Sequence, residues 1–117
     1  MEEKRVLIVD DALIMRKRIR QIAEEAGWQI AGEAADGLEA LEIYEKEKPD
    51  LVTMDIVMPN LDGVSALQQL MQQDPNARVV MVSAVNQKEK LTQCIQAGAM
   101  DFIVKPFEKA SLRRFFE

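Results

Sequence analysis

The sequence predicts an α/β domain built on a mainly parallel sheet of five strands, with helices on both faces. Two observations carry this prediction. Five short apolar segments each precede a segment whose apolar residues recur at helical spacing, and the turns between them are short and rich in Gly, Pro, Asp and Asn. Because consecutive parallel strands need a crossover between them, this alternation is typical of a parallel sheet covered by helices.

Local patterns place the elements along the chain. The predicted strands are residues 5–9, 28–34, 51–55, 78–82 and 99–104, with helices between them and a last short helix from about 108 to 116. Gly27 is expected to end the first helix. Asp36 with Glu39 predicts a capping box for the second helix, and Asn86 with Glu89 predicts a cap for the fourth.

Helical spacing also predicts which side chains point into the core. In the second helix these are Leu38, Leu41 and Tyr44, and in the fourth they are Leu91, Cys94 and Ile95. We expect both helices to pack these residues against the sheet, with their charged residues facing solvent.

Length and composition indicate one globular domain over residues 1–117, since 48% hydrophobic and 30% charged content are ordinary for such a chain. The net charge of −5 comes without any basic block, which argues against direct binding of nucleic acid. A charged start at residues 1–5 precedes an apolar run over residues 6–9 only. This pattern predicts neither a signal peptide nor membrane insertion, and therefore a cytoplasmic protein.

The chain contains no histidine and a single cysteine, Cys94. The missing histidine excludes Ser–His and Cys–His nucleophile pairs, imidazole metal ligands and a phosphohistidine on this chain. A lone cysteine excludes a disulfide framework, and Cys94 is expected to pack as a small apolar residue. Any chemistry must therefore depend on carboxylates, hydroxyls, lysine, backbone groups or a hard metal ion.

Polar side chains stand where four of the five predicted strands end. Asp10 and Asp11 follow the first strand, Asp55 ends the third, Ser83 follows the fourth and Lys105 follows the fifth. In a parallel sheet these ends share one edge, where ligands bind. The residues alone do not determine the strand order, but an order of 2-1-3-4-5 would bring the acids of the first and third strands together.

This set of residues matches the requirements of phosphoryl transfer. Clustered carboxylates repel one another and need a cation, and oxygen ligands without His or Cys suit Mg²⁺. A lysine and a hydroxyl can bind the oxygens of a phosphoryl group, and Asp55, nearest the centre, is the candidate nucleophile.

Each residue taken alone has an ordinary structural explanation. Asp10 and Asp11 can cap the first helix, Asp55 can begin an Asx turn, and a serine or lysine at a strand end is common. Their joint occurrence at one edge of the sheet favours a functional site.

Several motifs occur together in a characteristic order. They are VLIVDD at 6–11, MD at 54–55, MPNLDG at 58–63, VSA at 82–84 and GAMDFIVKPF at 98–107. With these motifs the whole chain resembles the receiver domain of bacterial two-component response regulators, and most of all the single-domain chemotaxis regulators. The resemblance implies a flavodoxin-like doubly wound (βα)5 fold with strand order 2-1-3-4-5. It also implies a phosphorylation-activated signalling switch that catalyses only its own phosphorylation and slow dephosphorylation.

The resemblance assigns the metal and the phosphoryl group to particular residues. Asp55 would accept the phosphoryl group from the phosphohistidine of a partner histidine kinase. Asp11, Asp55 and the backbone carbonyl of Val57 would bind Mg²⁺ or Mn²⁺ directly, and Asp10 would bind it through water. Ser83 and Lys105 would contact the phosphoryl oxygens.

The family also implies a mechanism of output. Phe102 would be the aromatic switch that turns inward when Ser83 engages the phosphoryl group, and the bond between Lys105 and Pro106 would be cis. The fourth helix, fifth strand and fifth helix would bind a downstream target such as a flagellar motor component or an effector domain.

The chain departs from the commonest family pattern at a few positions. Ala12 stands where a serine often caps the first helix, so Asp10 or Asp11 must cap it or the cap is lost. Phe102 replaces a frequent tyrosine. Val57 and Val85 occupy places that are often polar, and we expect their apolar side chains to order the attacking water poorly and slow the loss of the acyl phosphate.

One alternative stays open, and two other functions agree less well with the residues. The chain can be the receiver part of a longer regulator such as a transcription factor. Mg²⁺-dependent aspartyl-phosphate phosphatases usually carry a second acid two residues after the nucleophile, where this chain has Val57, and a cap domain for which it has no room. A flavodoxin-like cofactor site is disfavoured because Asp10 and Asp11 would repel the cofactor phosphate.

Overall fold

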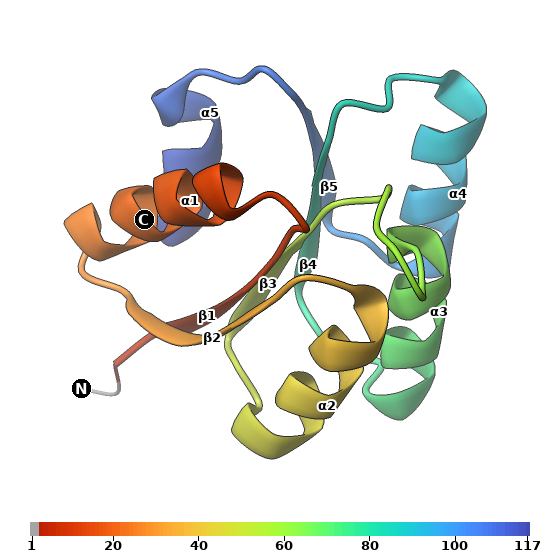
Figure 1. Ribbon diagram of the computed structural model, residues 1–117, viewed down its shortest axis with the longest axis horizontal. Coiled ribbons are helices and arrows are strands. Elements are labelled where there is room, and N and C mark those ends of the chain that lie inside the picture. The colour runs from red at the N-terminus through yellow and green to blue at the C-terminus, as the bar shows by residue number, and fades with distance from the viewer. Residues whose placement is uncertain (1–2) are drawn as a thin grey trace.

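The computed structural model describes residues 3–117, and five parallel strands form its central sheet (Figure 1). The strands are β1 (Arg5–Val9), β2 (Gln29–Ala34), β3 (Leu51–Met54), β4 (Val79–Ser83) and β5 (Asp101–Val104). They pair in the order β2-β1-β3-β4-β5, which confirms the flavodoxin-like fold. The predicted start of the domain at residue 1 lies outside the described residues.

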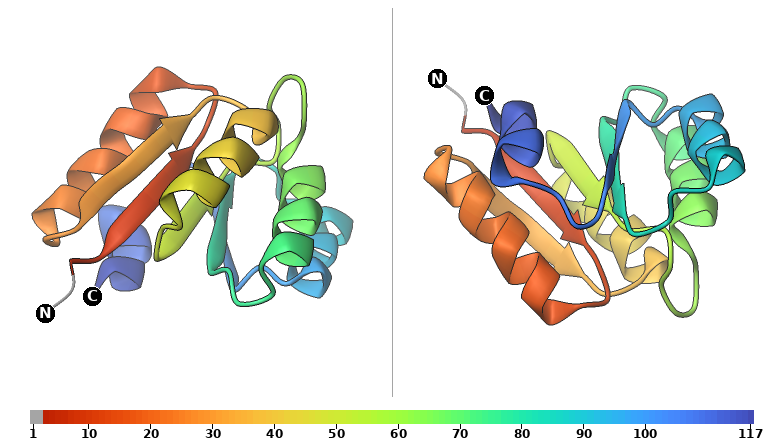
Figure 2. Two further views of the ribbon diagram at one scale, coloured as in Figure 1. Left: turned by 90° about the horizontal axis from the view of Figure 1, so that it is seen from below. Right: turned by 90° about the horizontal axis from the view of Figure 1, so that it is seen from above.

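Helices cover both faces of this sheet (Figure 2). They are α1 (Leu13–Glu25), α2 (Gly37–Glu47), α3 (Gly63–Gln73), α4 (Lys88–Ala97) and α5 (Lys109–Arg113), followed by the 3-10 turn η1 (Arg114–Phe116). The helices α1 and α5 lie on one face, and α2, α3 and α4 on the other. The predicted last helix is thus a short α-helix that tightens into a 3-10 turn. None of the described helices is long and apolar enough to cross a membrane.

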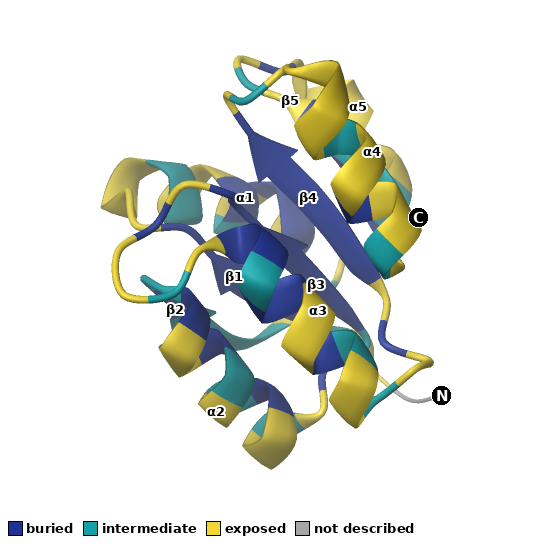
Figure 3. Ribbon diagram, turned by 90° about the vertical axis from the view of Figure 1, so that its right-hand side faces the viewer, coloured by how far each residue is buried: buried dark blue, intermediate teal, exposed yellow. Residues whose placement is uncertain are grey.

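The central strands are buried on both sides, as Figure 3 shows for β3 and β4. Val52 and Met54 point into the core under α2, α3 and α4, whereas Leu51 points into the core under α1 and α5. A strand covered on both faces must be apolar at successive positions, and this explains the continuous apolar runs in the sequence.

Two of the predicted helix boundaries are confirmed, and one is wrong. Gly27 follows the end of α1 with a φ of 89°, a conformation that glycine adopts without a Cβ clash. The Asp36 side chain accepts a hydrogen bond from the Glu39 N–H at 2.9 Å and so caps α2. The N-cap of α4 is Gln87, which makes no side-chain cap bond, so the predicted cap by Asn86 is wrong.

Two side chains predicted to point inward are exposed. Leu38 is 54% exposed and Ile95 50% exposed. In α2 the buried stripe contains Ala40 and Tyr44, and in α4 it is centred on Cys94. Each misplaced side chain lies off its stripe, because one residue is about 100° of rotation around a helix.

Candidate functional site

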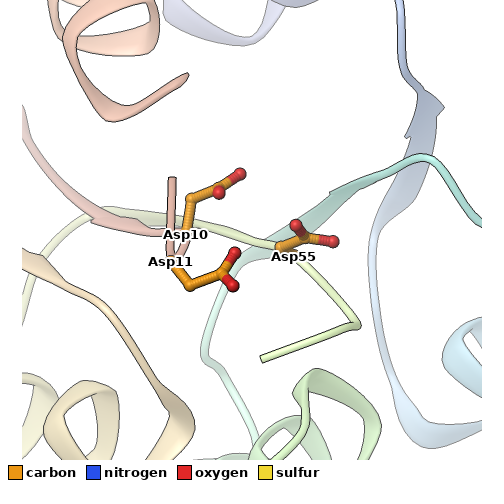
Figure 4. Close-up of side chains that lie close together, drawn as sticks. All are labelled: Asp10, Asp11 and Asp55. Atoms are coloured by element: carbon orange, nitrogen blue, oxygen red, sulfur yellow. The ribbon is translucent and has the colours of Figure 1, made fainter. Parts of the chain in front are cut away.

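The strand order brings the two acidic motifs together at the carboxyl edge of the sheet. Val9 of β1 pairs with Met54 of β3, so Asp10 and Asp55 each follow a residue of the same pair. The Asp55 N–H donates to the Val9 carbonyl at 3.0 Å, which continues the ladder into the site. Figure 4 shows the side chains of Asp10 and Asp11 extending from the end of β1 toward Asp55 at the end of β3.

These three acids form a cluster that suits a divalent metal ion. One carboxylate oxygen from each of Asp10, Asp11 and Asp55 lies within 4.8 Å of the others. Asp10 is 1% exposed and Asp55 7% exposed, while Asp11 is open to solvent. Three carboxylates so close together require a cation, and an all-oxygen ligand set with one open side fits Mg²⁺ and its waters. The residues present therefore fit such an ion.

Lys105 supplies a cation to the same cluster from β5. Its Nζ donates to Asp10 Oδ2 at 2.6 Å and to Asp55 Oδ2 at 3.0 Å. Burial alone would lower the pKa of Lys105, but the hydrogen bonds and charges of Asp10 and Asp55 outweigh burial and raise the pKa above its usual value. Lys105 therefore stays charged and balances part of the negative charge of the two buried acids.

The backbone fixes the orientation of both buried carboxylates. Asp10 Oδ1 accepts the N–H of Ala12 at 2.9 Å, and Asp55 Oδ1 accepts the N–H of Ile56 at 2.7 Å. Each carboxylate thus presents one oxygen to the backbone and the other to Lys105. The N-cap position of α1 is occupied by Ala12, and no side chain caps this helix with a hydrogen bond. Asp10 and Asp11 are consequently not explained as helix caps.

The remaining predicted residues lie around this cluster. Ser83 ends β4 and is 1% exposed, with its Oγ accepting a long bond of 3.4 Å from the Val85 N–H. Ser83 pairs with Val104, so it lies one position before Lys105 across the β4–β5 ladder. Phe102 is half-buried against the core under α2, α3 and α4. The peptide bond between Lys105 and Pro106 is cis.

Comparisons with known proteins agree on one family. Residues 6–117 match the response regulator receiver domain family. The chain is 54% identical to protein CcdB of Bacillus subtilis over 92% of the chain and 90% of that protein. It is 51% identical to the chemotaxis protein CheY of Thermotoga maritima over 90% of the chain and 88% of that protein. The chain belongs to the response regulator receiver family.

The likeness extends to a solved structure that contains BeF3 and Mg²⁺. The crystal structure of the CheX–CheY–BeF3–Mg²⁺ complex from Borrelia burgdorferi matches with a TM-score of 0.93 and 41% identity, over 95% of this chain and 84% of that chain. Members of this family are signalling modules rather than classical enzymes, and they bind Mg²⁺ at an acidic pocket. In this receiver domain the cluster of Asp10, Asp11 and Asp55 is such a pocket.

Sequence reasoning missed one residue beside the site of this receiver domain. Arg16, on the first turns of α1, donates from Nη1 to the backbone carbonyl of Asp10 at 2.6 Å and from Nε to Glu33 Oε1 at 3.1 Å. Arg16 thereby links the segment that carries Asp10 and Asp11 to β2. The helical pattern places Arg16 on a polar face, and no signal in the sequence distinguishes it from the neighbouring Lys17.

Val57 and Val85 are apolar residues in a cleft of mixed polarity beside the site, which Asp62, Asn86 and Lys90 also line. The cleft has a volume of ≈ 490 Å³ and lies between the loops that follow β3 and β4. The side chain of Val57 is exposed, with 64% of the residue open to solvent. A polar side chain at position 57 could therefore reach solvent molecules that approach the acids from this cleft.

Proposed function

We propose that this receiver domain accepts a phosphoryl group on Asp55 from the phosphohistidine of a partner histidine kinase. The observation that carries the proposal is the grouping of a nearly buried Asp55 with two further acids and with Lys105, whose Nζ lies 3.0 Å from Asp55 Oδ2. A phosphohistidine donor is made from ATP, so the proposal places this chain in the cytoplasm.

The transfer uses a carboxylate oxygen of Asp55 as nucleophile. That oxygen attacks the phosphorus, the phosphorus–nitrogen bond breaks, and its electron pair stays on the imidazole of the kinase. Asp55 then carries an acyl phosphate. Lys105 exchanges its bonds to the carboxylates for a bond to a phosphoryl oxygen, and the Ser83 hydroxyl donates to another.

The same acids hold the metal. We assign the direct ligands to Asp11, Asp55 and the backbone carbonyl of Val57, with Asp10 acting through water. Mg²⁺ or Mn²⁺ bound by these residues would neutralise charge that develops on the transferred group. The assignment is supported by the oxygen ligands and the open side of the cluster.

Phosphorylation is proposed to change the face formed by α4, β5 and α5. Movement of Ser83 onto the phosphoryl group makes room for Phe102 to turn inward. On this face Ile95, Met100 and Val104 are 50%, 43% and 38% exposed, which suits an apolar contact with a protein target. The likeness to CheY proteins supports a chemotaxis target such as a flagellar motor component, and another effector domain is the alternative.

The proposal is tested by incubating the protein with Mg²⁺ and acetyl phosphate and measuring its intact mass. Wild type should gain one phosphoryl group, and Asp55→Asn should gain none because an amide cannot form the acyl phosphate. Asp101→Asn is the matched control, since Asp101 lies at the opposite edge of the sheet and should leave the gain unchanged. Equal behaviour of wild type and Asp55→Asn would refute the assignment.

A further inference from the structure

Lys105 lies in a segment that belongs to no helix or strand. β5 ends at Val104, α5 begins at Lys109, and residues 105–108 between them adopt no regular secondary structure. The Lys105 N–H donates to the Ser83 carbonyl at 2.8 Å, but the next residue, Pro106, has no N–H to donate. The position of the Lys105 ammonium group therefore depends on what holds the residues that follow it.

Arg18, on α1, holds this segment through Phe107. Its Nη2 donates to the Phe107 carbonyl at 2.8 Å, and its Cζ lies 4.5 Å from the centre of the Phe107 ring. The planar guanidinium group can make both contacts at once because its donors point sideways while its face covers the ring. One side chain thus restrains both the backbone and the side chain of Phe107.

Phe107 transmits this restraint because it is itself anchored. It is 7% exposed and belongs to the core under α1 and α5, together with Ile19 and Leu112. Arg18 forms no ion pair with any residue from 3 to 117, so no acid among these residues competes for its guanidinium group. Its described polar contact is the Phe107 carbonyl.

We propose that Arg18 is a positioning residue for phosphoryl binding, acting through Phe107 on Lys105. With Phe107 held against α1, the chain two residues earlier presents Lys105 Nζ within 3.0 Å of Asp55 and 2.6 Å of Asp10. Without Arg18, the segment carrying Lys105 samples more positions, and fewer of them place the ammonium group where a phosphoryl oxygen on Asp55 would be. This inference rests on the proposed function, since it assumes that Lys105 contacts the phosphoryl group.

The test compares Arg18→Met with Lys17→Met. Each variant removes one positive charge from α1, and methionine at position 18 keeps an apolar contact over the Phe107 ring. Lys17 is exposed, and no hydrogen bond or ion pair is found for its side chain within residues 3–117. Beryllofluoride is titrated into each protein at saturating Mg²⁺, with binding followed by backbone amide NMR, and urea unfolding checks that both variants are folded.

We expect Arg18→Met to bind beryllofluoride about tenfold more weakly than wild type, by analogy with the loss of affinity when the partner behind a metal ligand is removed. Lys17→Met should bind like wild type. A second readout is the Lys105 Nζ resonance, assigned by its loss in Lys105→Met, which should shift or broaden in Arg18→Met alone. A merely structural role for Arg18 would lower the unfolding midpoint without moving this resonance.

The outcomes separate the two proposals. Failure of wild type to bind beryllofluoride with Mg²⁺ refutes the proposed function. Normal binding by wild type with equal affinities for Arg18→Met and Lys17→Met overturns the role of Arg18. Weaker binding by Arg18→Met with an unchanged Lys105 Nζ resonance also overturns it, because Arg18 would then act by another route.

Discussion

Lys105 and Asp55 lie 3.0 Å apart through Nζ and Oδ2, although 50 positions separate them in the chain. The same ammonium group lies 2.6 Å from Asp10 Oδ2. The partly buried ammonium group of Lys105 therefore balances part of the negative charge of the two buried acids, which leaves negative charge for a metal ion to neutralise.

Replacing Lys105 by methionine should destabilise the metal-free protein. Asp10 would be left buried without its cation, and breaking a buried pair in this way costs about 3 kcal/mol. Mg²⁺ should restore much of the lost stability, since it binds the folded state only. Urea unfolding with and without Mg²⁺ measures both effects. Lys109→Met, which breaks an exposed pair with Glu25, is the control and should change little.

Replacing Asp11 by asparagine should weaken Mg²⁺ binding without destabilising the fold. Asp11 is exposed, so its replacement removes a proposed metal ligand and one repelling charge without opening the core. We expect Mg²⁺ affinity, measured by calorimetry, to fall by more than about tenfold. Unfolding free energy without Mg²⁺ should stay the same or rise. A variant that binds Mg²⁺ as wild type does would exclude Asp11 from the ligand set.

Replacing Val57 by asparagine should speed the loss of the phosphoryl group. An amide in the cleft can orient the attacking water, and one hydrogen bond of about 1 kcal/mol in the transition state corresponds to roughly fivefold in rate. Dephosphorylation is followed after removal of the phosphodonor. Val57→Leu keeps the position apolar and should behave like wild type. An unchanged or slower rate for Val57→Asn would contradict the expectation that the apolar side chain of Val57 slows dephosphorylation.

Replacing Thr53 by valine should stabilise the fold. Thr53 is 0% exposed in β3, and its hydroxyl has no hydrogen-bond partner among residues 3–117. Valine has nearly the same shape and no unpaired polar atom, so the unfolding free energy should rise by about 1 kcal/mol. Thr92→Val, at an exposed position of α4, should show no such gain. A loss of stability in Thr53→Val would indicate a partner for the hydroxyl.

The stability of the protein should also fall at high pH because of Tyr44. Burial, together with the hydrogen bond and charge of Asp74, raises the pKa of Tyr44 above its usual value of 10.0, and the Tyr44 hydroxyl donates to Asp74 Oδ2 at 2.7 Å. Above about pH 10 the unfolded chain loses this proton before the folded protein does, so stability decreases as pH rises further.

Tyr44→Phe removes this dependence, at a cost of about 1 kcal/mol at pH 7 for the lost hydrogen bond. Tyr44 is the single tyrosine of the chain, so tyrosinate absorbance follows its titration directly. The difference in unfolding free energy between wild type and Tyr44→Phe should shrink above pH 10. A constant difference across that range contradicts the raised pKa.

Much of the fold could be predicted because its signals are local. Apolar runs of strand length, Gly27 at a helix end and Asp36 at a helix start each act within a few residues. The same locality explains the failures at Leu38 and Ile95, where the pattern identified a helix but left its rotation about the axis open. That rotation depends on contacts with the sheet and neighbouring helices.

For the candidate site, too, part could be predicted from local signals and part depended on tertiary contacts. The sequence by itself determined that acids, a serine and a lysine end the strands of a parallel sheet, and hence that they share one edge. Only the tertiary structure decided which of them meet, because the pairing of β1 with β3 brings Asp10 beside Asp55, and Lys105 reaches Asp10 across 95 positions. The roles of Arg16 and Arg18 also depend on tertiary structure, since a helical pattern marks an arginine as polar but does not specify which distant carbonyl it will contact.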